Sequence, residues 1–128
     1  MARKFRVGII GATKRGDYGH GMDTAFNDLP QFEVVALADP DDTGRAAAGK
    51  RSGAKRLYSD FREMLEMKGL DAIQIAVPDH WHSLTAIAAA RKKLDIFAEK
   101  PLALTVSEGR AMVAAERGRS MKWSRFSL

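Results

Sequence analysis

Short apolar runs alternate with longer segments of helical periodicity along this sequence. The clearest run is Asp71–Val77, where Ala-Ile-Gln-Ile-Ala-Val is almost continuously apolar. Such a run is typical of a strand in a parallel sheet that helices cover on both faces. Four more runs predict strands at Phe5–Ile10, Glu33–Ala38, Arg56–Tyr58 and Leu94–Ala98. Repeats of strand and helix with short connections predict an α/β fold with an open, doubly wound parallel sheet of about five strands.

The connections between these runs have the spacing and capping residues of helices. In the first connection, apolar side chains recur at helical spacing over Met22–Leu29, and Pro30 ends the segment. An Ala-rich helix through Lys50 is predicted next, with Asp41 or Asp42 as its cap. We therefore expect one helix in each of the first two connections.

Helices are also predicted after the third and fourth strands. Ser59 is the expected cap of the first of these, and Gly69 ends it. The second opens at Pro78-Asp79 and is expected to turn Leu84 and its apolar neighbours toward the sheet. Its last turn is basic, which suits the negative end of the helix dipole.

The composition fits a single globular domain and excludes several classes of protein. The 128 residues include 45% apolar residues and no cysteine, so neither a disulfide framework nor a thiolate metal site is expected. His80 and His82 lack a third metal ligand. No run approaches the ~20 apolar residues of a membrane span and no signal-peptide core follows Met1, so we expect a cytoplasmic protein that contacts no membrane. The net charge of +5 gathers at the two ends without interleaved aromatic residues, which argues against nucleic-acid binding.

A glycine-containing turn directly follows the first predicted strand. A dinucleotide fingerprint at this place has the form G-x-G-x-x-G/A, whose second glycine lets the backbone approach the pyrophosphate. Gly11 and Gly16 fit the first and third positions and Ala12 lies between, but Thr13 replaces the second glycine. A side chain there either displaces the pyrophosphate outward or donates its hydroxyl to a phosphate oxygen. Glycines also form ordinary turns, so the turn alone is weak support for nucleotide binding.

Asp39 ends the second strand and strengthens this interpretation. A carboxylate beside the first strand can accept hydrogen bonds from both ribose hydroxyls of adenosine and would repel a 2′-phosphate, which favours NAD over NADP. NADP remains possible, because Arg45, Lys14 or Arg15 can pair with a phosphate. Asp39 can instead be a turn former or a helix cap before Pro40. A flavodoxin-like sheet also stays open, since element order does not give the spatial order of strands.

The ends of the fourth and fifth strands are the most specific part of the sequence. They read Ile75-Ala-Val-Pro-Asp-His-Trp-His82 and Glu99-Lys-Pro-Leu102. Together with Val7-Gly-Ile-Ile-Gly11 and Ala38-Asp39, they closely resemble the N-terminal domain of the Gfo/Idh/MocA oxidoreductases, the glucose–fructose oxidoreductase and inositol dehydrogenase group. The resemblance covers residues 5–117 and implies a dinucleotide-binding Rossmann fold that uses NAD or NADP.

The resemblance also implies roles for the residues at these strand ends. It implies that Lys100 is catalytic, with an ammonium that hydrogen-bonds a sugar hydroxyl and stabilises the alkoxide that precedes hydride loss. Glu99 is expected to orient Lys100 or to bind the nicotinamide ribose, and Pro101 to fix the backbone. Pro78 and His82 are expected at the cofactor. Without the family, Lys100 is an ordinary loop lysine and His82 an ordinary residue at the start of a helix.

The resemblance implies that relatives have a second α/β domain that binds substrate, and we expect this sequence to lack it. Residues 118–128 have no apolar β-branched run and look like an irregular, truncated tail. We expect a cofactor-binding domain for hydride transfer with a sugar or polyol hydroxyl, inactive alone. Both a monomer and a homo-oligomer stay open. The alternative is a noncatalytic nucleotide-binding or regulatory module, or a pseudogene remnant. Relatives usually end the fourth helix with a C-cap glycine, where Lys93 stands here, at a cost of ~1 kcal/mol if the backbone is left-handed.

Overall fold

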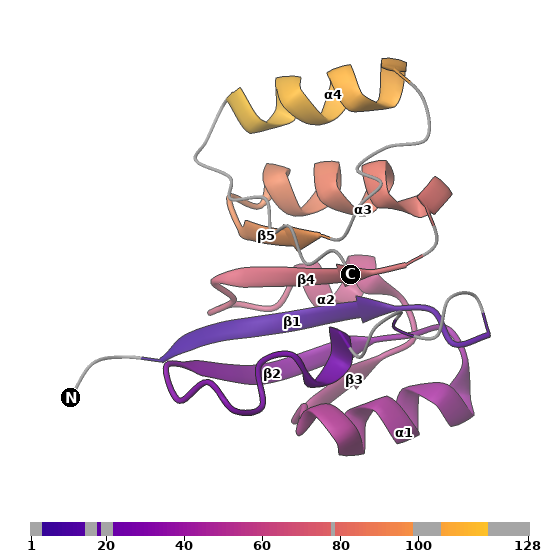
Figure 1. The fold of residues 1–128 in the computed structure, drawn as a ribbon, viewed down its shortest axis with the longest axis vertical. Helices are drawn as coiled ribbons and strands as arrows, with labels where there is room; N and C mark the ends of the chain where they lie inside the picture. Colours follow the sequence, from indigo (N-terminus) through magenta and orange to yellow (C-terminus); the bar gives the residue numbers. More distant parts are fainter. Residues whose placement is uncertain (1–3, 15–17, 19–21, 78, 99–105, 118–128) are drawn as a thin grey trace.

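The apolar runs form a five-stranded sheet in which every neighbouring pair is parallel (Figure 1). The computed structural model describes residues 4–14, 18, 22–77, 79–98 and 106–117. The strands are β1 (Phe5–Gly11), β2 (Phe32–Ala38), β3 (Arg56–Tyr58), β4 (Ala72–Ala76) and β5 (Asp95–Ala98). Their order is β3-β2-β1-β4-β5. This order confirms the doubly wound α/β prediction and excludes the flavodoxin-like alternative, because β1 lies between β2 and β4 here, whereas a flavodoxin-like sheet places β1 between β2 and β3.

Helices cover both faces of the sheet, and each face has its own apolar core. They are the short 3-10 helix η1 (Met22–Thr24), α1 (Asp42–Ser52), α2 (Phe61–Leu65), α3 (Asp79–Arg91) and α4 (Val106–Arg117). On one face, Ile9 and Leu37 pack with Phe26 and Ala48, from the η1 segment and α1. The opposite face packs its isoleucines against α2 and α3, and α4 lies outside α3 (Figure 1). The side chains in this second core include Ile10, Ile73, Ile75, Met64, Ala86 and Ala89.

The predicted helix over Met22–Leu29 is wrong. After η1 the chain continues in turns, with hydrogen bonds from Asn27 N to Thr24 O (3.1 Å) and from Leu29 N to Phe26 O (3.2 Å). The apolar spacing serves a different purpose, because Phe26 packs on the rings of Phe32 and Phe97 at centroid distances of 4.9 and 5.5 Å. Asn and Asp, which follow Phe26, also have low helix propensity.

Two helix caps were predicted at or near the right place. Asp41, not Asp42, caps α1, since its carboxylate accepts from Gly44 N at 2.8 Å. The cap of α2 is Asp60, whose carboxylate accepts from Arg62 N at 2.9 Å, so the prediction of Ser59 is wrong by one residue. Both Ser and Asp are good caps, and the sequence alone does not rank neighbours of this kind.

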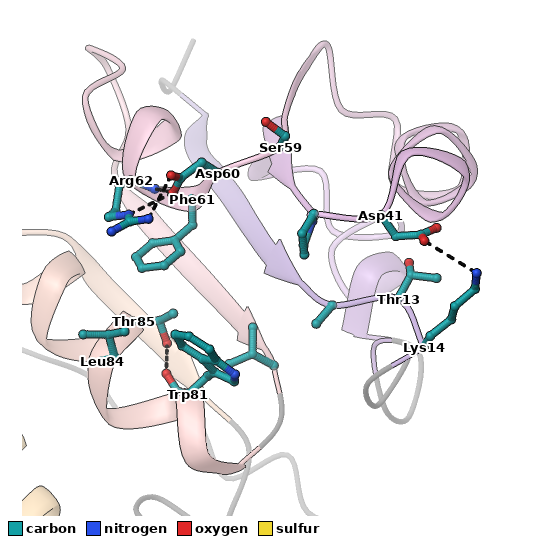
Figure 2. Close-up of a pocket in the computed structure, with 13 residues that line it drawn as sticks. Thr13, Lys14, Asp41, Ser59, Asp60, Phe61, Arg62, Trp81, Leu84 and Thr85 are labelled. Carbon is teal, nitrogen blue, oxygen red and sulfur yellow. Dashed lines mark hydrogen bonds and ion pairs between the residues drawn. The ribbon is translucent and has the colours of Figure 1, made fainter.

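The inward face of α3 differs from the prediction. Leu84 is 50% exposed, whereas Ala86, Ala89 and Ala90 are buried on the sheet. These alanines have the i, i+3, i+4 spacing of one helix face, and their small size lets α3 lie close to the sheet. Leu84 is therefore left on the side of α3 that faces the strand ends (Figure 2).

The left-handed backbone conformation that was considered for Lys93 in the sequence is present at the end of α3. Lys93 has φ of 59°, and two hydrogen bonds close the helix end: Lys93 N to Ala90 O at 2.9 Å and Leu94 N to Ala89 O at 3.3 Å. This pattern is a Schellman motif, in which glycine is the usual left-handed residue. A lysine there takes on a backbone conformation that a side chain disfavours.

Candidate functional site

A cavity of about 720 Å³ opens at the carboxyl ends of the central strands, beside the point where the strand order reverses (Figure 2). Ligands of open α/β sheets bind at this location. Segments that follow β1, β2, β3 and β4 all contribute to the walls, together with α3. The lining residues are Ala12, Thr13, Lys14, Pro40, Asp41, Ser59, Asp60, Phe61, Arg62, Val77, Trp81, Leu84 and Thr85.

One side of the cavity is apolar and aromatic. Phe61 from α2 faces Trp81 and Leu84 from α3 across the opening (Figure 2). The Arg62 guanidinium lies 5.8 Å from the centre of the Phe61 ring and forms an ion pair with Asp60 at 3.1 Å. The hydrogen bonds from Arg62 hold the pKa of the Asp60 carboxyl below its usual value. This side of the cavity can take a flat, weakly polar ring such as a nucleobase.

The other side of the cavity is charged. Lys14 follows β1 and is 80% exposed, and its ammonium lies 3.7 Å from Asp41 Oδ1 (Figure 2). Asp41 is held in place by α1, because its Oδ2 accepts from Gly44 N. A carboxylate and an ammonium group therefore lie side by side at the edge of the cavity, next to Thr13.

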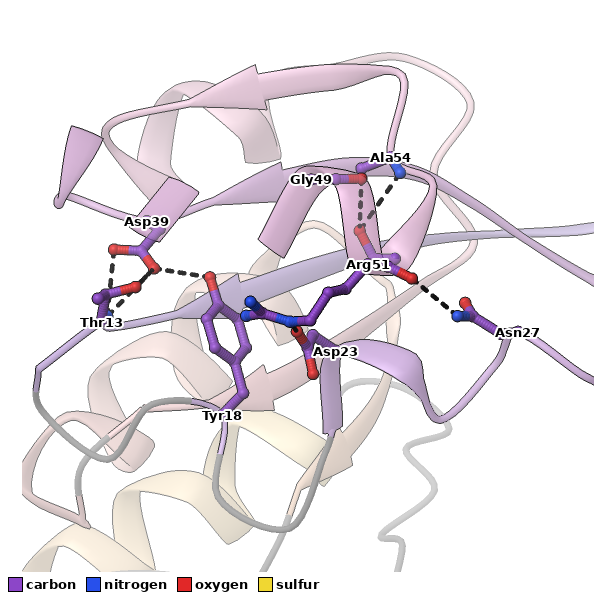
Figure 3. A network of polar contacts seen from close by, with 9 residues as sticks. Thr13, Tyr18, Asp23, Asn27, Asp39, Gly49, Arg51 and Ala54 are labelled. Atoms are coloured by element: carbon purple, nitrogen blue, oxygen red, sulfur yellow. Dashed lines mark hydrogen bonds and ion pairs between the residues drawn. The ribbon is translucent and has the colours of Figure 1, made fainter. Parts of the chain in front are cut away.

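Asp39 is completely buried, and Figure 3 shows its carboxylate beside Thr13 and the Tyr18 hydroxyl. Its carboxylate accepts from Thr13 N at 3.1 and 3.2 Å, from Thr13 Oγ1 at 2.6 Å, from the Tyr18 hydroxyl at 2.7 Å and from Asp41 N at 2.9 Å. A carboxylate offers about four lone-pair sites. The four donor groups from Thr13, Tyr18 and Asp41 therefore fill it, and they join the turn after β1 to the end of β2.

Thr13 is accommodated by a glycine on a neighbouring helix. Its hydroxyl donates to Asp39, so it is not turned outward as a donor to phosphate. The Thr13 side chain lies against Gly44 in the first turn of α1, where a Cβ atom on Gly44 would overlap it. The glycine that the fingerprint lacks at Thr13 is thus compensated by Gly44, and the loop keeps its close packing.

Tyr18 fills the space beside Gly11. The Tyr18 ring lies where a Cβ atom of Gly11 would be, and the side chain is 2% exposed. The backbone of Tyr18 is left-handed, with φ of 67°. Burial, and then the hydrogen bond to Asp39, raise the pKa of the Tyr18 hydroxyl far above its usual value. The Arg51 guanidinium lies 5.8 Å from the ring centre and forms an ion pair with Asp23 (Figure 3).

Sequence reasoning missed both Tyr18 and Gly44. A threonine at the second glycine position indicates that a neighbouring element must make room for its side chain. Gly44, a glycine within an Ala-rich helix, was the available candidate. No comparable signal marks Tyr18, because its place against Gly11 and Asp39 depends on the path of the loop. Gly11 was expected to serve the turn, and it also makes room for this ring.

Of the other predicted site residues, the structure places Ala12 and Thr13 at the cavity. Gly16, Pro78, Glu99, Lys100 and Pro101 lie outside the described residues, as does the side chain of His82. Among the residues that the structure describes, no group of three or more His, Asp or Glu side chains is arranged for a metal ion. Within the same residues, no helix has both the length and the apolar character needed to cross a membrane.

Comparisons with known proteins connect this site to a family. The family profile described as an oxidoreductase family with an NAD-binding Rossmann fold, GFO_IDH_MocA, matches residues 5–124. D-apiose dehydrogenase of Paraburkholderia graminis is 35% identical over 113 residues, which cover 88% of this chain and 29% of that protein. The chain therefore spans less than a third of the length of this relative.

Solved structures show the same fold. Myo-inositol 2-dehydrogenase from Lactobacillus plantarum matches with a TM-score of 0.81 and 25% identity, over 95% of this chain and 36% of that chain. A levoglucosan dehydrogenase in complex with NADH and L-sorbose matches with a TM-score of 0.78 and 29% identity, over 94% of this chain and 34% of that chain. Each similarity is confined to about a third of the other protein.

Proposed function

From the premise that the chain belongs to the Gfo/Idh/MocA family of oxidoreductases, with the NAD-binding Rossmann fold of that family, we propose that it is the cofactor-binding domain of a sugar or polyol dehydrogenase. The observation that carries the proposal is the cavity at the strand ends, which combines an apolar, aromatic side with a charged edge. The relatives named above act on D-apiose, inositol and levoglucosan, and these names support a polyhydroxylated substrate.

The residues around the cavity fit the adenosine half of NAD. Its volume of about 720 Å³ lies in the range of small-molecule sites. Phe61, Trp81 and Leu84 can enclose the adenine ring, while the turn at Ala12 and Thr13 lines the opposite part of the cavity, where the phosphates can pass. Because Gly44 has no side chain, the turn can keep this path although it contains a threonine.

The chemistry would take place where the turn and the ends of β4 and β5 converge. When bound, the nicotinamide accepts or returns a hydride. We propose that the Lys100 ammonium donates a hydrogen bond to the substrate hydroxyl and stabilises its alkoxide, with Glu99 and Pro101 holding that segment in position. Pro78 and His82 are proposed to lie at the same end of the cofactor.

The test is a fluorescence titration of the purified chain with NADH. We expect saturable binding, and loss of binding in Leu84→Asp, which places a charge in the apolar side of the cavity. Val113→Asp is the matched control, because Val113 is 44% exposed on α4 outside the cavity and Leu84 is 50% exposed on α3. Absence of binding in the unsubstituted chain, or equal binding in the two variants, would contradict the proposed site.

Turnover is a separate measurement. Hydride transfer needs a substrate held against the nicotinamide, and the chain matches only 29% of the length of a dehydrogenase that performs it. We therefore expect little or no NADH production by the chain alone with a panel of sugars and inositols. Robust production would show that the domain is active by itself, and Lys100→Ala should then abolish turnover while leaving NADH binding intact.

A further inference from the structure

We infer that Asp41 and Lys14 are the side chains that distinguish NAD from NADP in this protein, and that Asp39 has become a structural residue. The inference rests on the proposed function, because it assigns the adenosine ribose to the charged edge of the cavity. It differs from the expectation drawn from the sequence, in which Asp39 accepts from the ribose hydroxyls directly.

The first argument is that Asp39 has no acceptor capacity left. Its side chain is completely buried, and its two oxygens accept from the backbone and hydroxyl of Thr13, the hydroxyl of Tyr18 and the backbone of Asp41. A ribose hydroxyl could bond to this carboxylate only by displacing one of these donors. Each displaced group would then need a new partner in a buried environment, which is unfavourable.

The second argument is that Asp41 has the exposure and position that Asp39 lacks. Asp41 lines the cavity, and its side chain is 27% exposed. Its Oδ2 is engaged with Gly44 N, while Oδ1 faces the Lys14 ammonium at a distance of 3.7 Å. This is longer than a good charge-assisted hydrogen bond, so Oδ1 can accept from a ribose hydroxyl without losing a strong contact.

The third argument concerns the phosphate that NADP adds to the ribose. A 2′-phosphate beside Asp41 would meet like charge, whereas the Lys14 ammonium would attract it. Arg45, which the sequence also suggested for this role, is engaged elsewhere: its guanidinium donates to Asp39 O at 2.9 Å and to Asp42 Oδ1 at 2.6 Å. Among the residues that the structure describes, the balance between Asp41 and Lys14 therefore sets the preference.

The experiment compares NADH and NADPH affinities of the 128-residue chain by fluorescence titration. Asp41→Asn is the main variant, because asparagine is as good a helix cap as aspartate and keeps α1 intact. We expect its NADH affinity to fall roughly ten-fold or more, the range of a hydrogen bond to a charged group, while its NADPH affinity stays equal or rises. Asp42→Asn is the matched control, since Asp42 is 91% exposed and does not line the cavity, and it should bind NADH like the unsubstituted chain.

A second pair of variants tests the cation. Lys14→Gln should lower the affinity for NADPH more than that for NADH, whereas Lys55→Gln should change neither, because Lys55 pairs with Glu33 away from the cavity. Asp39→Asn should lower the melting temperature, which reports its structural role.

The outcomes separate the inference from the proposed function. NADH affinity unchanged in Asp41→Asn but lost in Asp39→Asn, measured well below the melting temperature, would overturn the inference and restore Asp39 as the ribose contact. A chain that is folded yet binds neither nucleotide would overturn the proposed function, and the inference with it.

Discussion

Thr13 and Gly44 show how a departure from a sequence motif is absorbed by the fold. The Thr13 side chain occupies the space in front of Gly44, and its hydroxyl is bonded to a buried carboxylate. The presence of a threonine in the turn and of a glycine in the helix is explained only when the two residues are considered together. Gly44 in the first turn of a helix costs about 1 kcal/mol relative to alanine, and this cost is offset by the room that it provides for Thr13.

A double-mutant cycle on this pair should give a change of sign. In the natural sequence, Gly44→Ala should lower the free energy of unfolding by on the order of 2 kcal/mol, because its Cβ would overlap Thr13. In a Thr13→Gly background the same substitution should be neutral or stabilising by up to about 1 kcal/mol, since alanine is the better helix former. Urea denaturation of the four proteins measures both effects. Equal effects in the two backgrounds would show that the residues do not interact.

Tyr18 predicts a stability change at alkaline pH. Its pKa is raised in the folded state, so the folded state keeps the proton after unfolded chains have lost theirs. The stabilisation is fully present below the ordinary tyrosine pKa of about 10, and it is lost as pH rises above that value, at up to about 1.4 kcal/mol per pH unit. Tyr18→Phe should be less stable at pH 7, because Asp39 loses a donor, but less sensitive to pH above 10.

Urea unfolding from pH 7 to 11 measures this difference, and Tyr58→Phe is the matched tyrosine control. Parallel pH profiles for the natural chain and Tyr18→Phe would contradict the assignment. The control matters because many lysines also titrate in this range, and their contribution cancels only between closely matched proteins.

Part of the site could be predicted at the scale of residues. Gly11, Thr13 and Asp39 were expected to gather at the ends of β1 and β2, because parallel strands present their carboxyl ends at one edge. Their mutual contacts were not predictable. Asp39 was expected to be available to a ligand, and nothing in the sequence indicates that Tyr18 and Asp41 N reach it first.

At the scale of elements, Lys93 is the clearest position for stabilisation. Its φ of 59° ends α3 in a left-handed conformation that glycine adopts without strain. Lys93→Gly should therefore raise the free energy of unfolding by about 0.5–1 kcal/mol. Arg91→Gly is the matched control: Arg91 is the last residue of α3 and the same substitution there should destabilise the protein. Thermal melts of the two variants with opposite shifts would support this, and a lower melting temperature for Lys93→Gly would contradict it.

The strands were easier to predict than the helices, for a physical reason. A strand buried on both faces needs an almost continuous apolar run, and β4 has one with Gln74 as its single polar residue. A helix needs only a periodic pattern, and Met22–Leu29 has that pattern because Phe26 packs into an aromatic cluster, not because the backbone is helical. Leu84 shows the same ambiguity, since apolar residues near the start of α3 line the cavity and those farther along face the core.

At the scale of the whole molecule, the described part of the chain builds the adenosine side of the proposed site most completely. The cavity is lined by residues 12–14, 40–41, 59–62, 77, 81 and 84–85. Its position was predictable from the fold, because ligands of such sheets bind where the strand order reverses. The charged edge of the cavity depends on side-chain placement and was not predictable.

Because the described residues mainly surround the adenosine side of the proposed site, we can predict which part of the cofactor stabilises the protein most. A ligand present at 100 times its dissociation constant adds about 2.7 kcal/mol to the stability of the folded state, which for a domain of this size is roughly 10 °C in melting temperature. ADP-ribose should reproduce most of the shift given by NADH when both are at 1 mM, and nicotinamide mononucleotide should give a much smaller one. Differential scanning fluorimetry measures all three. A larger shift with the mononucleotide would place the main binding energy elsewhere.

The packing of Thr13 against Gly44 also restricts how this sequence can change over generations. Replacing Gly44 first produces an overlap, whereas replacing Thr13 by glycine first costs only its hydrogen bond to Asp39 and then opens position 44 to other residues. The path from this sequence to a complete glycine fingerprint therefore has a preferred order of steps. Among descendants of a common ancestor, we expect a bulky residue at one of these two positions to be accompanied by glycine at the other.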